Sequence, residues 1–237
     1  MRLSAPIYRL KRQARVLSRS ENIPHHEALD RVAQREGFDS WSLLANRTSA
    51  NHIGKSLIKE LELGDLLLVG ARPGQGKTLL SLEIAVEAMR IGHRSVFFSL
   101  DYTEVDVADR FADLGQDLAE FKGRFEFDGS EDICASYMIN HLASAPAGTV
   151  IVVDYLQLLD QRRENPDLME QVKSLRAFAK ERKLILVFIS QIRRDYDGSR
   201  SSLPRLRDVR LPNPLDLAFF DKTCFLNAGE IEFAAVG

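Results

Sequence analysis

Residues 65–87 read DLLLVGARPGQGKTLLSLEIAVE, and this stretch decides the fold of the chain. Its apolar run from Leu66 to Val69 is typical of a buried parallel strand. A glycine-rich turn follows, and the apolar residues from Leu79 onward recur with the period of a helix. The order of strand, turn and helix predicts one unit of a parallel α/β sheet.

The turn has the pattern of a phosphate-binding loop. Gly74 and Gly76 allow neighbouring backbone N–H groups to converge on one point, to which the following helix also directs its positive end. We expect Lys77 to reach the β- and γ-phosphates of a nucleotide and the Thr78 hydroxyl to ligate Mg²⁺. Ala71 replaces the first glycine of the usual pattern G-x-x-x-x-G-K-[ST]. The residues expected to bind the nucleotide are Ala71, Arg72, Pro73, Gly74, Gln75, Gly76, Lys77, Thr78 and Leu79.

Three further buried strands are predicted downstream, with helices between them. The strands are expected at 95–100, 150–153 and 184–189, and the helices at 105–114, 133–143 and 168–182. Strands that alternate with helices predict right-handed crossovers and a parallel sheet. The carboxyl ends of all four strands should therefore lie at one edge, where ligands bind in such sheets.

Polar side chains end three of these strands. Asp154 follows an apolar strand, an arrangement in which a carboxylate holds Mg²⁺ together with Thr78. Asp101 could align or deprotonate an attacking water, or it could cap the next helix, with Glu104 acting as the base. Gln191 suits a sensor of the γ-phosphate, or it is a turn amide. The candidate catalytic residues are therefore Lys77, Asp101 and Gln191, and the candidate metal ligands are Thr78 and Asp154.

The composition, 45% hydrophobic and 28% charged over 237 residues, is that of an ordinary globular protein. A formal net charge of -2 argues against a globally basic coat for nucleic acid. Cys134 and Cys224 lack C-x-x-C spacing, so we expect two core thiols, a reducing cytoplasm and no zinc site. We expect no membrane segment, because a turn and polar residues interrupt the longest uncharged stretch, 133–153.

The amino-terminal region predicts small helices. The first carries six basic residues and no acidic residue before Glu21: Arg2, Arg9, Lys11, Arg12, Arg15 and Arg19. A second helix begins at Pro24, and Ser40 can cap a third that carries Trp41. The basic helix either lies on a nucleic-acid backbone or belongs to a helical cap with solvated charges, anchored by Trp41.

The expected domain organisation has three parts. Residues 1–47 form the helical region, 48–56 a polar linker, and 57–237 the α/β core. His25 and His26 could suggest a metal site, but no further ligands accompany them, so we interpret them as surface histidines.

Together, the strand ends resemble the RecA-like ATPase core, specifically the C-terminal domain of the DnaB-type replicative DNA helicases. The resemblance covers about 57–232 and is carried by LELGDLLLVGARPGQGKT (61–78), VFFSLD (96–101), IVVDYLQLLD (151–160), SLRAFAKE (174–181) and ISQIRR (189–194). It implies a RecA-like P-loop NTPase with a central, mainly parallel sheet flanked by helices, here with a small N-terminal helical appendage.

The same resemblance implies ATP and Mg²⁺ as cofactors, a homo-oligomeric ring and single-stranded DNA as a partner. The loops after the third and fourth strands would contact the DNA, which makes arginines in them candidates for phosphate contacts. These candidates are Arg162, Arg163, Arg193, Arg194 and Arg200.

Three features depart from the family pattern. Asp101 stands where the family has glutamate, the helical region is much smaller, and the chain ends EIEFAAVG about where an arginine finger is expected. Such a finger contributes about 10³ to 10⁵ in turnover. We therefore expect either a helicase-type ATPase or, alternatively, an ATP-switched binding module with weak turnover and no unwinding. A RecA-like signalling or recombination accessory ATPase and a small-molecule phosphotransferase are further possibilities.

Overall fold

The computed structural model describes residues 4, 7–160, 162, 164–196, 202–211 and 213–236. Arg2, Arg163, Arg200 and Gly237 lie outside the described residues. The helices are α1 (Ile7–Glu21), α2 (His25–Arg35), α3 (Trp41–Glu60), α4 (Lys77–Arg90), α5 (Glu104–Asp113), α6 (Ala135–His141) and α7 (Leu168–Arg182). The strands are β1 (Leu66–Ala71), β2 (Ser95–Ser99), β3 (Phe125–Asp128), β4 (Val150–Asp154), β5 (Ile185–Gln191), β6 (Lys222–Asn227) and β7 (Glu230–Ala235).

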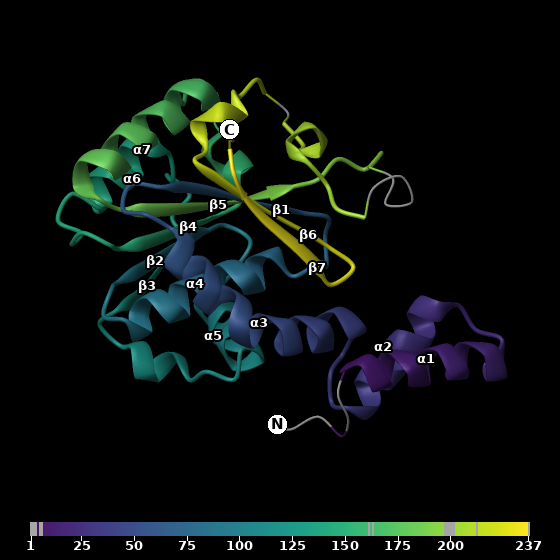
Figure 1. Cartoon of the computed structure of the whole chain (residues 1–237). Coiled ribbons are helices and arrows are strands. Elements are labelled where there is room, and N and C mark those ends of the chain that lie inside the picture. Colours follow the sequence, from purple (N-terminus) through teal and green to yellow (C-terminus); the bar gives the residue numbers. More distant parts are fainter. Residues whose placement is uncertain are drawn as a thin grey trace.

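The strands form one sheet in the order β3-β2-β4-β5-β1-β6-β7 (Figure 1). Neighbouring strands are parallel except β6 and β7, so the expected α/β sheet is confirmed. Helices α6 and α7 cover one face, and α3, α4 and α5 cover the other (Figure 1). Alternate residues of β1 face the two layers: Leu67 and Val69 pack with α4, and Leu66 and Leu68 pack with α7.

Strands β3, β6 and β7 are not among the strands that the sequence predicts. The four residues of β3 lie in a charged stretch and form an edge strand that pairs with β2. Strands β6 and β7 form a hairpin whose turn residues, Ala228 and Gly229, both have positive φ. Pairing with a neighbouring strand stabilises each of these three strands, and such pairing is not a local sequence signal.

Helices α1 and α2 and the start of α3 form a small N-terminal unit with its own core. Its buried side chains are Leu10, Ala14, Ala28, Val32, Ala33 and Leu44, and Trp41 packs against them. Ser40 caps α3 as predicted, since its hydroxyl accepts a 3.4 Å hydrogen bond from the Leu43 N–H. Trp41 thus anchors this unit, while contact between the basic residues of α1 and a nucleic-acid backbone stays a prediction.

The predicted polar linker, 48–56, is not an irregular segment, because it lies inside the continuous helix α3. No proline interrupts the sequence from Trp41 to Glu60, so nothing prevents the backbone from continuing its helical hydrogen bonds. The later part of α3 packs against α4, where Gly54 of α3 lies directly over Glu83. The division of the chain into domains stays a prediction.

The two cysteines occupy different environments. Cys224 is buried in β6, whereas Cys134 is partly exposed, so the expectation of two core thiols is wrong for Cys134. The reason is its place at the N-cap of α6, where its sulfur lies 3.2 Å from the Ser136 hydroxyl. Among the helices of the described part, none has the length and apolar character that a membrane span needs.

Candidate active site

The phosphate-binding loop lies between β1, which ends at Ala71, and α4, which begins at Lys77. Gly74 and Gly76 have φ values of 75° and 86°, a region that side-chain-bearing residues rarely adopt. The Gly76 carbonyl accepts the first helical hydrogen bond of α4, from Leu80 N–H at 2.9 Å. The loop thus presents the start of α4, with its positive dipole end, to the carboxyl edge of the sheet.

Lys77, Thr78 and Asp154 come together at this edge. The Thr78 hydroxyl donates a 2.8 Å hydrogen bond to the Asp154 carboxylate, which is only 4% exposed. Burial raises the pKa of Asp154 to about 6, although the Thr78 hydrogen bond and the Lys77 charge act in the opposite direction. Burial also lowers the pKa of Lys77, while the charges of Asp154 and Asp101 counteract it.

This pair of oxygen donors fits Mg²⁺, which prefers oxygen ligands and is usually held by one or two protein groups, with phosphates and water completing its shell. Within the described ranges there is no group of three or more His, Cys, Asp or Glu residues that could hold a metal by itself. His25 and His26 therefore belong to no such cluster there.

Asp101 follows β2 and is exposed, but its charge acts on both Lys77 and Asp154. The alternative that Asp101 caps α5 is wrong, because Thr103 is the N-cap. The Thr103 hydroxyl accepts from the Asp106 N–H at 3.3 Å, and the Asp106 carboxylate accepts from the Thr103 N–H at 2.8 Å. This capping box places the N-cap of α5 two residues after Asp101, so α5 begins at Glu104.

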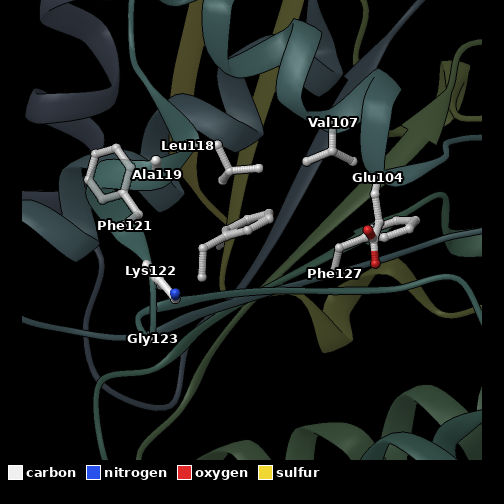
Figure 2. A pocket seen from close by; sticks show the side chains of 9 residues that line it. Glu104, Val107, Leu118, Ala119, Phe121, Lys122, Gly123 and Phe127 are labelled. Atoms are coloured by element: carbon white, nitrogen blue, oxygen red, sulfur yellow. The ribbon is translucent and has the colours of Figure 1, made fainter.

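Glu104, the alternative base, lines a different cavity. This groove of about 420 Å³ is bounded by α5, by β3 and by the segment between them, and Phe121, Phe125 and Phe127 form much of its wall. Figure 2 shows the groove, with the Glu104 side chain pointing into it from α5. Asp101 is therefore the better candidate for a carboxylate that faces the phosphate loop.

Gln191 lies beside the phosphate loop in the sheet, since it is the residue in register with Ala71. Its side-chain oxygen accepts a 3.5 Å hydrogen bond from the Arg210 guanidinium, and its carbonyl accepts from the Arg210 N–H at 2.7 Å. Gln157, which the sequence analysis did not consider, also contacts this segment, because its amide donates to the Arg210 carbonyl at 2.6 Å. Gln191 thus connects the phosphate-loop strand to the segment after β5.

A cavity of about 260 Å³ lies over the phosphate loop, and we call it the phosphate cavity. The core contributes Gly74, Gly76, Lys77, Thr78, Leu79, Tyr102 and Arg110, and the N-terminal unit contributes Ser40, Ser42 and Leu43. The Tyr102 hydroxyl shares a hydrogen bond with Thr78, while burial raises the pKa of Tyr102.

Five of these residues belong to no sequence motif that predicts a site: Tyr102, Arg110, Ser40, Ser42 and Leu43. Arg110 forms a 2.8 Å ion pair with Asp113, yet its Nε is buried without a hydrogen-bond partner among the described residues. Tyr102 could have been expected near the site from the sequence, because it directly follows Asp101. The others depend on how α5 and the N-terminal unit pack.

The candidate DNA-contacting arginines differ in their surroundings. Arg162 forms a 2.7 Å ion pair with Asp132, and Arg193 forms one of the same length with Asp195. Arg194 is exposed next to Arg193. Arg162 and Arg193 would therefore have to exchange an intramolecular carboxylate for a phosphate in order to contact DNA.

The family model described as "DnaB-like helicase C terminal domain" matches residues 50–122 and 134–215. The chain belongs to this family. The DnaB-like chain is 26% identical over 182 residues to the replicative DNA helicase DnaB of Mycoplasma genitalium, and 25% identical over 181 residues to a probable plasmid replicative DNA helicase of Chlamydia trachomatis. These matches cover 62% and 63% of this chain but only 39% and 40% of the relatives. The chain thus spans about two fifths of their length.

Solved structures support the RecA-like fold. One of them, an ATPase domain, matches with a TM-score of 0.55 and 17% identity, covering 72% of this chain and 73% of that one. A KaiC-like protein from the hyperthermophilic archaeon Pyrococcus horikoshii OT3 matches with a TM-score of 0.52 and 18% identity, covering 70% and 74%. The sequence resemblance to DnaB-type helicases is therefore confirmed for the family and for the fold.

Proposed function

We propose that this chain binds ATP with Mg²⁺ at the phosphate cavity, hydrolyses it, and acts on single-stranded DNA as a helicase-type motor. The observation that carries the proposal is the 2.8 Å hydrogen bond from Thr78 to the buried Asp154 carboxylate, beside Lys77. A hydroxyl that is hydrogen-bonded to a buried carboxylate, next to an ammonium group at a phosphate-binding loop, suits a metal–triphosphate complex. Membership of the DnaB-like family supports the same reaction.

Each side chain has a role in this proposal. Loop N–H groups and Lys77 neutralise the phosphates, and Thr78 and Asp154 hold Mg²⁺, which when bound stabilises charge on the phosphate oxygens. Asp101 is exposed, so water reaches it, and its carboxylate orients that water and accepts its proton. Gln191, through its hydrogen bond to Arg210, relays the presence of the γ-phosphate to the segment after β5.

The partner that we propose is single-stranded DNA, with Arg193 and Arg194 as contacts and a ring of identical subunits as the assembly. Phosphate contacts by arginine make such binding depend strongly on salt. We also propose a cytoplasmic location, because Cys134 and Cys224 are both free and a reducing compartment keeps thiols in that state.

The second candidate function is an ATP-switched binding module with weak turnover. It is favoured by Asp101, which is one methylene shorter than glutamate and is not among the described residues that line the phosphate cavity. If the Asp101 carboxylate lies too far from the attacking water, hydrolysis is slow and ATP stays bound for longer. In that case the protein would act through its ATP-bound state rather than through repeated hydrolysis.

Steady-state ATP hydrolysis with and without single-stranded DNA tests the proposal. Lys77→Ala should abolish turnover and weaken ATP binding at least tenfold, whereas Lys173→Ala, an exposed lysine on α7, should match the wild type. DNA-stimulated turnover would exclude the switch module, and tight ATP binding with negligible turnover would favour it. Wild-type ATP binding by Lys77→Ala would refute the site assignment.

A further inference from the structure

One wall of the phosphate cavity does not come from the ATPase core. Ser40, the N-cap of α3, and Ser42 and Leu43, in the first turn of α3, line it together with Lys77 and Thr78. These residues precede the family match, which begins at residue 50. The N-terminal unit therefore lies over the proposed nucleotide site of its own chain.

A second cavity adjoins the first, and we call it the outer cavity. It has about 500 Å³, and Ser42 lines both cavities. On the core side it is bounded by Gln75 of the phosphate loop and by the β6–β7 turn at Ala228, whose N–H donates a 2.7 Å hydrogen bond to the Gln75 side chain. On the other side the N-terminal unit contributes Trp41.

The sizes of the cavities suggest how a nucleotide divides between them. Pockets that enclose small ligands measure about 300–1,000 Å³. The phosphate cavity, at about 260 Å³, is below that range, whereas the two cavities together fall within it. If the phosphates occupy the phosphate cavity, the nucleoside does not fit there as well. It would therefore extend past Ser42 into the outer cavity, toward Trp41.

The chemistry of the outer cavity suits a base and a ribose. Trp41 offers an aromatic surface, on which nucleobases stack. Arg15, His25 and Asp30 supply polar groups around it. One Asp30 oxygen already accepts a 2.8 Å hydrogen bond from the backbone N–H of Trp41, which holds the start of α3 in place. Ser42 lies where the two cavities meet, because it lines both of them.

We infer that the amino-terminal turn of α3 is the nucleoside-binding wall of the site, with Trp41 and Ser42 contacting the base and ribose of the ATP whose phosphates lie on the loop. This inference rests on the proposed function. The position of the wall is supported by α3 itself, which runs from Trp41 to its contact with α4 at Gly54 and Glu83. The same two helices, α3 and α4, thus fix the wall and the phosphate loop relative to each other.

Isothermal calorimetry on three full-length proteins tests the inference, with Mg-ATP and inorganic tripolyphosphate as probes. Ser42→Trp fills the junction, so ATP affinity should fall at least tenfold while tripolyphosphate affinity changes less than threefold. Ser20→Trp, on the exposed side of α1, is the matched control and should bind both probes like the wild type. Wild-type ATP affinity in Ser42→Trp would overturn the inference.

The wild-type chain offers a second test that requires no variant, since Trp41 is its single tryptophan. Saturation with Mg-ATP should change the Trp41 emission with the midpoint that calorimetry gives, and tripolyphosphate should change it less. Unchanged emission with ATP bound would overturn the inference and leave the proposed function intact. Failure of the wild type to bind ATP would instead refute both.

Discussion

Replacing Glu83 with glutamine should stabilise the protein by an amount that grows with pH. Glu83 lies on α4 beneath Gly54 of α3, is 5% exposed, and has a carboxyl oxygen without a hydrogen-bond partner among the described residues. Burial raises its pKa from 4.5 to about 8; Glu87 adds to the increase, and the Gly54 N–H and Arg90 oppose it. The folded protein therefore keeps this proton over a range in which the unfolded chain releases it.

The sign and the size of the effect follow from this difference. Between pH 4.5 and about 8 the folded state binds more protons than the unfolded state, so stability falls as the pH rises. At 1.36 kcal/mol per pKa unit, the loss is roughly 3 kcal/mol at pH 7 and between about 4 and 5 kcal/mol above pH 8. Glutamine has the same shape, keeps an acceptor for Gly54, and carries no charge, so Glu83→Gln should avoid this loss.

Urea denaturation at pH 5, 7 and 8.5 measures the effect. The difference between Glu83→Gln and the wild type should be small at pH 5 and reach a few kcal/mol at pH 8.5. Glu164→Gln, at an exposed turn, is the control and should change stability by less than about 0.5 kcal/mol at any of these values. Parallel stability profiles for Glu83→Gln and the wild type would refute the reasoning, because Glu83 would then be ionised in the folded state.

Two further predictions concern the sheet and the chemistry. Gly70→Ala would place a Cβ 2.6 Å from the ring of the buried Phe225, so the free energy of unfolding, measured by urea denaturation, should fall by about 1–3 kcal/mol. Adding Phe225→Leu should recover part of this loss. Equal stability of Gly70→Ala and the wild type would contradict this packing. Asp101→Glu adds the methylene that the family has at this position, so kcat for ATP should rise severalfold with little change in KM. A lower kcat would argue against Asp101 as the water-orienting carboxylate.

The sequence was sufficient for the central part of the fold because its signals are local. Four apolar residues after Asp65 and four before Asp154 can form buried strands with little help, and the helix 168–182 has the boundaries that its apolar spacing predicts. Strand β3 has two phenylalanines among charged residues, and its identity depends on pairing with β2. Such pairing is not visible in a local window of sequence.

The candidate site likewise has residues that the sequence predicts and residues that only the tertiary structure reveals. Lys77, Thr78 and Asp154 were predictable, because the loop pattern and the strand ends determine their meeting. The contribution of Ser42 was not, since it depends on α3 being one unbroken helix that directs its first turn toward the phosphate loop. A polar composition at 48–56 is compatible with both a linker and a helix, and only tertiary packing distinguishes them.

The unbroken course of α3 has a mechanical consequence. A helix rises about 1.5 Å per residue, so Trp41 lies roughly 20 Å along the axis from the crossing point at Gly54. A tilt of about 10° around that pivot would swing the far end by ~3 Å, the thickness of an aromatic ring. A small rearrangement beside Glu83 would thus displace the first turn of α3, which lines the phosphate cavity, by about the same distance.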